Sequence, residues 1–329
     1  MHYLKPVLLC LTCLPLFAAA TDFDYVGLGF ENDVFYREDD GYTNGLTVNW
    51  GYYGRSADAE QDLPAWSLPL FTQTYLNNLE NRQHAIHYTL GQFLQTSTDI
   101  ELTELAEDDA PYVGMIAGQV NLSSYNQQVA DDVSLTVGMV GPVAGGEYVQ
   151  KHLHKWIRAN KPRGWDDQIN NELVFRLEAE RKWRHALAQF TNGSELDVVS
   201  AMNAGVGTLL SDVKVGASLR WGQALAQNFQ SSSPFLAQRI NGLKTNAIGW
   251  YVFTNFSTSY VVNDIFIDGN TFEDSHHVDL EHLQAEVSAG IQVNWQHWNV
   301  IYKMLYGTEQ YKTQRDETRW GNVAITYHF

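Results

Sequence analysis

Apolar and polar residues alternate with a period of two along many stretches of the chain. In the stretch 42–53, the apolar face carries Leu46, Val48, Trp50 and Tyr52. In the stretch 213–224, valine, leucine and tryptophan oppose Lys214 and Arg220. Successive side chains of a β-strand point to opposite faces, so this pattern indicates strands with one apolar and one polar face. Cationic groups opposite a wholly apolar face predict water on one side of the strand and lipid on the other.

The end of the chain has the same pattern. Counting back from Phe329, the apolar residues Tyr327, Ile325 and Val323 alternate with small or polar ones. A last strand that alternates and stops on an aromatic residue is typical of outer-membrane barrels, and it resembles the signal that their insertion machinery reads. This stretch therefore predicts a strand that closes a barrel.

Strand patterns of this kind predict an all-β fold, a twelve-stranded antiparallel transmembrane β-barrel with a short helix in an extracellular loop. The even number is the one that single-chain bacterial barrels require. With both termini in the periplasm, the first hairpin turns outside the cell, and the inner connections 54–82 and 225–245 are longer than expected. The predicted strands are 23–35, 42–53, 83–95, 112–126, 131–142, 170–190, 195–209, 213–224, 246–262, 279–295, 297–309 and 316–329.

Composition supports lipid contact over the alternative, a soluble β-sandwich. Aromatic residues make up 13% of the chain, including ten Trp and seventeen Tyr, while the mean hydropathy is −0.29. Beyond residue 20 no run of about twenty apolar residues offers a membrane-spanning helix. Strands that are apolar on one face, with aromatic girdles at both interfaces, account for these features. A sandwich would leave long and unusually aromatic faces in water.

The N-terminus predicts a secretory signal. A basic segment, "MHYLK", precedes the apolar run "PVLLCLTCLPLF" and a small-residue stretch that ends at Ala20. We therefore expect a signal peptide at 1–20 and a barrel domain at 21–329. Both cysteines, Cys10 and Cys13, fall inside the signal, so the processed chain would have neither a disulfide nor a thiolate metal site.

Oxygen-bearing side chains gather in the stretch "ENDVFYREDDGYTNG" at 31–45. Asn32 and Asp33 end one predicted strand, and Thr43 and Asn44 begin the next, so the hairpin brings them together at the outer rim. By parity, Glu31, Asp33 and Thr43 point into the lumen, and Asn32 points toward lipid unless the strand ends there. The alternative is ordinary turn chemistry, since Asn-Gly favours reversals.

The loop 140–172 predicts a short amphipathic helix at 146–159. Its apolar stripe consists of Val149, Leu153, Trp156 and Ile157, and Glu147, Gln150 and His154 line a neighbouring stripe. A helix packed at the barrel mouth by its apolar stripe would aim these polar groups in one direction. The alternative for His154 is a helix-end residue near the carbonyl dipole, and we expect His152, on another face, to be solvated.

An ordered set of short motifs carries a resemblance to a known family. The motifs are "END", "YTNG", "DDAPYVG", "GPVAGGE", a glutamine four residues before a histidine, "GWDDQINNE" and the later "FIDGN". Over nearly the whole processed chain, this set resembles the lipid A 3′-O-deacylases of bacterial outer membranes. The resemblance implies a twelve-stranded barrel that removes the 3′ acyloxyacyl group of lipid A by Ca²⁺-dependent ester hydrolysis.

The resemblance also implies site residues and partners. The residues that match the catalytic positions are His154, Gln150, Asn32, Asp33 and Thr43, and those that match calcium ligands are Asp33 and Glu172. The implied partners are lipopolysaccharide and the outer membrane, with a monomeric protein and no nucleic acid. The family also has a lysine on a barrel strand, where the stretch "GQFLQ" offers Gln92 and Gln95 instead.

The chemistry of ester hydrolysis suits these residue types. A base that works near neutral pH must take a proton from water, and histidine is the ordinary choice. Calcium binds six to eight oxygen ligands and acts as a Lewis acid on a carbonyl. The opening stretch would then form half of a site for metal and oxyanion, and the loop helix would supply the base.

Net charge bears on how the substrate is held. The chain carries a formal charge of −17, so overall attraction does not explain binding of a phosphorylated lipid. The helix-bearing loop nevertheless holds a basic cluster: Lys151, Lys155, Arg158, Lys161 and Arg163. This cluster either contacts phosphate or forms a solvated basic face.

Two other functions remain open from the sequence. One is a lipid esterase similar to outer-membrane phospholipase A, which relies on a Ser-His-Asn arrangement and calcium. No serine lies within convincing sequence reach of a suitable histidine. The other is a non-enzymatic porin or adhesin barrel, whose lumen would conduct ions.

Overall fold

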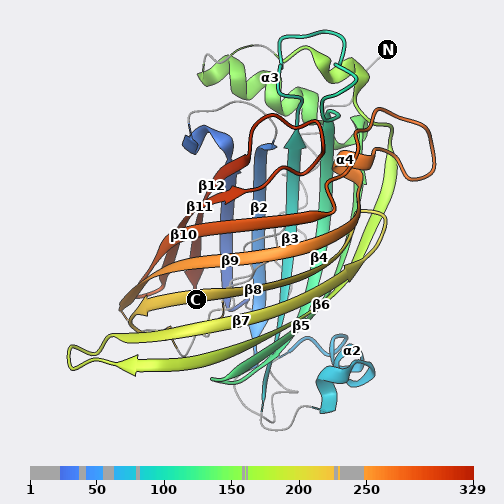
Figure 1. Cartoon of the computed structure of the whole chain (residues 1–329). Coiled ribbons are helices and arrows are strands. Elements are labelled where there is room, and N and C mark those ends of the chain that lie inside the picture. The colour runs from blue at the N-terminus through green and yellow to red at the C-terminus, as the bar shows by residue number, and fades with distance from the viewer. Residues whose placement is uncertain are drawn as a thin grey trace.

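The computed structural model describes residues 23–36, 42–54, 63–78, 82–157, 160, 162–225, 229 and 248–329. In this part of the chain, twelve antiparallel strands form a closed barrel in which each strand pairs with its neighbours in sequence and β1 pairs with β12 (Figure 1). The strands are β1 (Tyr25–Asn32), β2 (Tyr42–Tyr53), β3 (Gln83–Gln95), β4 (Val113–Tyr125), β5 (Val129–Val140), β6 (Glu172–Gln189), β7 (Glu195–Val206), β8 (Leu210–Gly222), β9 (Gly249–Asp264), β10 (Leu283–Trp295), β11 (Trp298–Gly307) and β12 (Thr318–His328).

The predicted fold is confirmed. Each predicted strand corresponds to one observed strand, and the ends differ by a few residues in either direction. The last strand closes the barrel from Tyr25 opposite His328 to Asn32 opposite Gly321. The signal peptide predicted at 1–20 lies outside the described residues, as does most of the connection 225–245.

The barrel has two distinct ends. The terminal end holds the start of β1 and the end of β12, together with α2 (Leu68–Gln73) and η4 (Tyr75–Asn78). The loop end holds η2 (Asp33–Tyr36), η5 (Pro142–Ala144), α3 (Gly146–Ile157), η6 (Gly164–Asp167) and α4 (Ile265–Asp268). Figure 1 shows α3 and α4 at one end and α2 at the other. Among the described helices, none has the length and apolar character needed to cross a membrane.

The outer face of the wall is apolar and the inner face is polar, as the alternation predicts. On β8, Val213 and Leu219 are exposed on the outside, whereas Lys214 and Arg220 are buried on the inside. The inner charges are paired rather than solvated, because Arg220 Nη2 lies 2.7 Å from Asp197 Oδ2 and Lys214 Nζ lies 2.7 Å from Glu286 Oε1. Ion pairs between strands therefore occupy part of the lumen.

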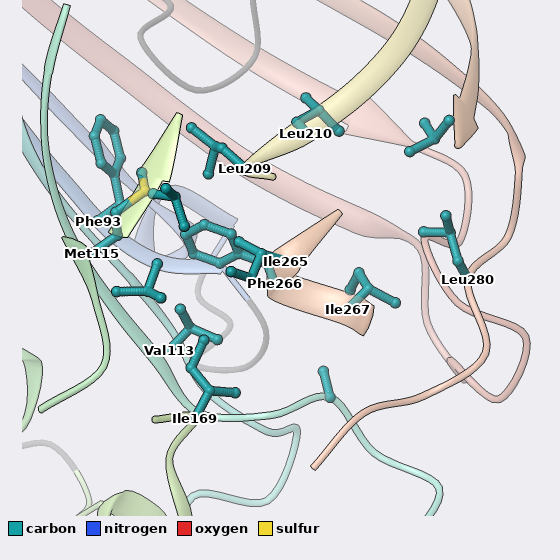
Figure 2. Packing of buried hydrophobic residues seen from close by; sticks show 14 of the residues in the cluster. Phe93, Val113, Met115, Ile169, Leu209, Leu210, Ile265, Phe266, Ile267 and Leu280 are labelled. Carbon is teal, nitrogen blue, oxygen red and sulfur yellow. The ribbon is translucent and has the colours of Figure 1, made fainter. Parts of the chain in front are cut away.

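An apolar cluster lies inside the barrel near the loop end. Phe266, in α4, is 1% exposed and packs with Phe93 and Met115 from the inner faces of β3 and β4 (Figure 2). Gln95 Nε2 donates a hydrogen bond to the carbonyl oxygen of Phe266 at 2.6 Å, which holds α4 in place. The described structure therefore has a plug of side chains where an open pore would need water.

Candidate active site

A row of outward-facing positions crosses the first four strands at the loop end. Asn44 of β2 pairs with Leu94 of β3, which pairs with Gly114 of β4. Asn32 of β1 lies one residue beyond the pair of Glu31 with Gly45, so it adjoins Asn44. These positions alternate with inward residues, and elsewhere on the same outer face leucines are exposed. Asn32 and Asn44 are only 6% and 7% exposed, so two amide side chains are buried on the outside of the wall.

The turn after β1 explains part of this burial. Residues Asp33–Tyr36 form the 3-10 helix η2 instead of continuing the strand. Its Phe35 packs outside the barrel, with ring centroids 6.2 Å from Phe30 and 5.9 Å from Tyr302. Gly321 permits this contact, since a Cβ there would lie 2.6 Å from the Phe35 Cβ. The chain therefore folds back onto the outer wall.

This turn corrects the parity argument for Asp33. The sequence predicted that Asp33 points into the lumen, but alternation ends at Asn32, so parity no longer fixes its direction. Asp33 is 2% exposed. Thr43 lies at an irregularity in the pairing of β2 with β3, between Tyr42 and Asn44, and its side chain lies outside the described part of the structure.

The helix α3 begins against the outer wall beside this row. A Cβ on Gly146 would lie 2.6 Å from the Trp165 ring and 2.8 Å from Leu94 Cδ2. Gly145 has a φ of +71°, a left-handed conformation that glycine adopts without strain. The Gly pair at 145–146 therefore provides both the turn and the close approach. Gln92, on the outer face of β3, donates from Nε2 to the Ala144 carbonyl at 2.6 Å and fixes the start of the helix.

Two predicted site residues share the buried side of α3. Gln150 and His154 are 1% and 3% exposed. Trp165 Nε1 donates to Gln150 Oε1 at 2.6 Å, and Gln150 Nε2 is buried with no hydrogen-bond partner among the described residues. Trp165 packs edge-on against Tyr112, with ring centroids 5.1 Å apart. Burial raises the pKa of the Tyr112 hydroxyl, which keeps this packing partner neutral.

The contact of the His154 ring fixes its proton. Nδ1 lies 2.6 Å from the carbonyl oxygen of Asn160. A carbonyl only accepts, so Nδ1 carries the hydrogen and, in the neutral ring, the lone pair is on Nε2. The alternative interpretation of His154, a helix-end residue near the carbonyl dipole, also implies a contact with a carbonyl. His154 does contact one, but this carbonyl belongs to Asn160, which follows the helix, and the contact orients the ring. His152 is exposed, as predicted.

The basic loop is only partly described. Lys151 pairs with Glu147 on the same helix, and Lys155 and Arg163 are exposed. Arg158 and Lys161 lie outside the described residues. Contact of this cluster with phosphate stays a prediction.

Glu172 occupies a different place from the other predicted residues. It begins β6 at an inward position, opposite Val140. Its Oε2 accepts hydrogen bonds from the Thr271 backbone N–H at 2.9 Å and from Asn270 Nδ2 at 3.1 Å. It thus holds the segment after α4, while Asn32 and Asn44 lie on the outer face. Within the described residues, no group of three or more His, Cys, Asp or Glu side chains is placed to hold a metal ion.

Sequence reasoning did not predict the contacts of three residues of this arrangement. Asn44 stood in the "YTNG" motif, but its burial depends on what covers the outer wall. Gln92 was noted only where the family has lysine, and Trp165 has no periodicity that links it to Gln150. These roles depend on contacts between loops, and the alternation of residues along a single strand does not predict such contacts.

Comparisons with known proteins agree with this architecture. The family model of the outer membrane protein LpxR matches residues 6–329. The chain belongs to the LpxR family. A solved structure, LpxR from Salmonella typhimurium, is similar at a TM-score of 0.76 and 17% identity, covering 93% of this chain and 100% of that chain. The β domain of the Bordetella autotransporter BrkA is similar at a TM-score of only 0.46 and 7% identity, covering 93% of this chain and 98% of that chain. No curated protein matches the chain.

Membership of the LpxR family places the barrel in the outer membrane. The outward apolar face then contacts lipid, and in such barrels the longer loops are extracellular while the termini are periplasmic. The loop end is accordingly the extracellular end. The buried polar row of this LpxR-family protein therefore lies on the outside of the wall near the outer leaflet.

Proposed function

We propose that the protein hydrolyses the ester that attaches the 3′ acyloxyacyl chain of lipid A, with His154 as general base and Ca²⁺ as cofactor. Family membership supports deacylation of lipid A in general. The observation that carries the proposal is the burial of Asn32 and Asn44 on the outer wall at the loop end, beside a helix that begins against this wall and buries Gln150 and His154. A lipid of the outer leaflet reaches such a site by lateral movement, without leaving the membrane.

His154 is suited to activate water. Its Nδ1–H is held by the Asn160 carbonyl, so the nitrogen that accepts a proton is Nε2. Orientation of a histidine through its other nitrogen is a common feature of general bases. A positioned base contributes a factor of about 10² to 10⁴ in rate.

Gln150 is suited to stabilise the developing oxyanion. Ester hydrolysis builds negative charge on the carbonyl oxygen, and preorganised N–H donors lower the energy of that state. Trp165 holds Oε1 of Gln150, which leaves the Nε2 donor without a partner in the described structure. The hydrogen bond from Trp165 therefore also prevents rotation of the amide.

Calcium fits the donor set at the turn after β1. Asp33 follows Asn32 directly in the chain, and Asp33, Asn32 and Asn44 are all buried near the end of the first two strands. Hard cations prefer carboxylate and amide oxygens of this kind. Asp33 would hold the ion with neutral oxygens nearby. Glu172 remains a predicted ligand from the motif match alone, because its Oε2 binds the segment after α4. Calcium, when bound, polarises the ester carbonyl as a Lewis acid.

The two alternative functions have less support. A phospholipase of the Ser-His-Asn type orients its histidine through an asparagine side chain, whereas the Asn160 contact to His154 is through the backbone carbonyl. A porin needs a wet lumen, whereas α4 and its apolar cluster occupy this one.

The test compares two histidines of one helix. His154→Ala should give a folded, heat-modifiable barrel that has lost a factor of about 10² or more in release of acyl chains from lipid A. His152→Ala, two residues earlier and exposed, should keep full activity. Mass spectrometry of lipid A and of phospholipids from the same cells measures both. Acyl release by His154→Ala, or loss of chains from phospholipids instead of lipid A, would contradict the proposal.

A further inference from the structure

The connection after β2 lies outside the barrel wall at the terminal end. In Figure 1, α2 stands beside the lower end of the strands. Leu63, Phe71 and Leu76, which flank or belong to α2 and η4, are 7%, 4% and 0% exposed. They pack against Ile86 and Leu122, outward positions of β3 and β4. The segment 63–78 thus covers part of the wall that elsewhere faces lipid.

A buried carboxylate on the outer wall holds this segment in place. Asp131 of β5 faces outward, and its side chain is 0% exposed. Tyr75 of η4 donates its hydroxyl to Asp131 Oδ1 at 3.2 Å. Arg82 Nη1 and Arg181 Nε lie 2.7 Å and 2.5 Å from the same carboxylate. The ion pairs compensate the buried charge of Asp131, and the hydrogen bond from Tyr75 joins the segment to the wall.

The segment also has an exposed edge that is mostly apolar. Trp66, Leu70 and Tyr75 are 52%, 40% and 41% exposed. The backbone is satisfied locally, since Ser67 N–H donates to the Pro64 carbonyl at 2.8 Å and Leu70 N–H to the Ser67 carbonyl at 3.0 Å. A compact, self-bonded segment with an exposed aromatic edge is suited to the interface of a bilayer.

This edge continues an aromatic girdle of the barrel. The Trp66 ring lies 6.1 Å from that of Tyr88, which stacks on Trp50 at 5.5 Å. Other aromatic pairs follow the same end, including Trp298 with Tyr327 at 4.9 Å. Trp and Tyr gather where barrel walls meet the headgroups. Trp66 therefore extends the row of aromatic side chains at the terminal end.

We propose that the segment 63–78 is an interfacial anchor whose edge of Trp66, Leu70 and Tyr75 lies among the phospholipid headgroups of the periplasmic leaflet. Glycerophospholipid is the occupant because the edge is continuous with the lipid-facing wall and the girdle. The anchor would set the depth of the barrel in the membrane. This proposal rests on the outer-membrane location of the barrel and does not depend on the proposed activity.

A single cysteine at each of three exposed positions tests the depth. Cys10→Ala and Cys13→Ala remove the native thiols, and Leu70→Cys, Leu135→Cys and Thr191→Cys are labelled separately with a polarity-sensitive dye. Leu135 is on the outward face of β5, and Thr191 is in the exposed turn between β6 and β7. Each refolded, heat-modifiable protein is placed in vesicles of phosphatidylethanolamine and phosphatidylglycerol that carry nitroxide lipids.

The expected result is that each label is quenched most by a different quencher. The label at Leu70 should be quenched more by a nitroxide near the headgroup than by one near the chain end, with blue-shifted emission. The label at Leu135 should show the reverse order, and the label at Thr191 should respond only to aqueous iodide. A label at Leu70 that behaves like the one at Thr191 in these vesicles, which contain no other protein, would overturn the proposal. Protection of Leu70 only in native membranes would point to a protein partner and would overturn it as well.

Discussion

The indole of Trp165 donates a hydrogen bond to the side-chain amide of Gln150 at 2.6 Å, and both side chains are 1% exposed. Trp165 belongs to η6 and Gln150 to α3, so the bond joins the two halves of one extracellular loop. It fixes which end of the amide faces the indole and which end faces away. Loop packing and amide orientation are therefore coupled at this residue pair.

Trp165→Phe should separate these two effects. Phenylalanine keeps an aromatic ring against Tyr112 but removes the N–H donor. Loss of one hydrogen bond of about 1 kcal/mol lowers the rate of lipid A deacylation roughly fivefold to tenfold if the amide acts in the transition state. Tyr112→Phe is the matched control, because it touches the same indole without bonding Gln150. Initial rates of acyl release per folded molecule measure the effect, and equal rates for both variants and the parent would rule it out.

Gln92→Ala should loosen the start of α3. It removes the bond from Nε2 to the Ala144 carbonyl, worth about 1 kcal/mol. We expect faster amide hydrogen exchange in residues 144–150 and a severalfold lower deacylation rate. Gln95→Ala is the control on the same strand, since Gln95 faces the lumen and bonds Phe266 instead. Unchanged exchange in the helix of Gln92→Ala would show that this bond does not position it.

The sequence predicted the barrel well because each strand carries its own evidence. Val213 and Lys214 oppose each other on β8 whatever the rest of the chain does, so alternation finds the strand and its faces. It does not show what covers a face. Lys214 was expected to face water, but it pairs with Glu286 from β10, 72 residues away. Asp33 was assigned to the lumen because parity was continued through a turn that forms a 3-10 helix.

The candidate site was predicted in part for the same reason. The helical spacing put Gln150 and His154 on one stripe, and both are buried together. The sequence placed the site at the barrel mouth, whereas the structure places its polar row on the outer wall. The difference arises from Phe35 and Gly146, which fold η2 and α3 onto that wall. Such contacts depend on loop conformation rather than on local pattern.

Removal of calcium should stop the reaction without unfolding the barrel. A chelator should abolish acyl release, and Ca²⁺ should restore it better than Mg²⁺, which tolerates irregular oxygen ligands poorly. Asp33→Asn should raise the half-saturating concentration of calcium, because it removes the buried charge that would hold the ion. Titration of activity with calcium, together with heat-modifiable mobility as the folding check, measures this effect. Full activity in the presence of chelator would exclude a calcium requirement.

Glu172→Gln tests the second predicted ligand. The substitution keeps an acceptor oxygen for Thr271 and Asn270 but removes the charge. Because the Glu172 carboxylate is turned toward the segment after α4, we expect a smaller change in the calcium requirement than for Asp33→Asn. Parallel calcium titrations of the two variants compare them directly. An equal or larger shift for Glu172→Gln would assign the ion to the inner side of the rim.

Phe266→Ala should destabilise the plug and reveal whether it seals the lumen. Phe266 is 1% exposed inside the apolar cluster, and truncation of such a phenylalanine costs about 3–5 kcal/mol. The parent should be silent in planar bilayers, and the variant should unfold at a lower temperature and show intermittent conductance. Phe272→Ala, in the loop that follows α4 and 76% exposed, should change neither property. Steady conductance by the parent would mean that water passes the cluster, and the porin alternative would then regain support.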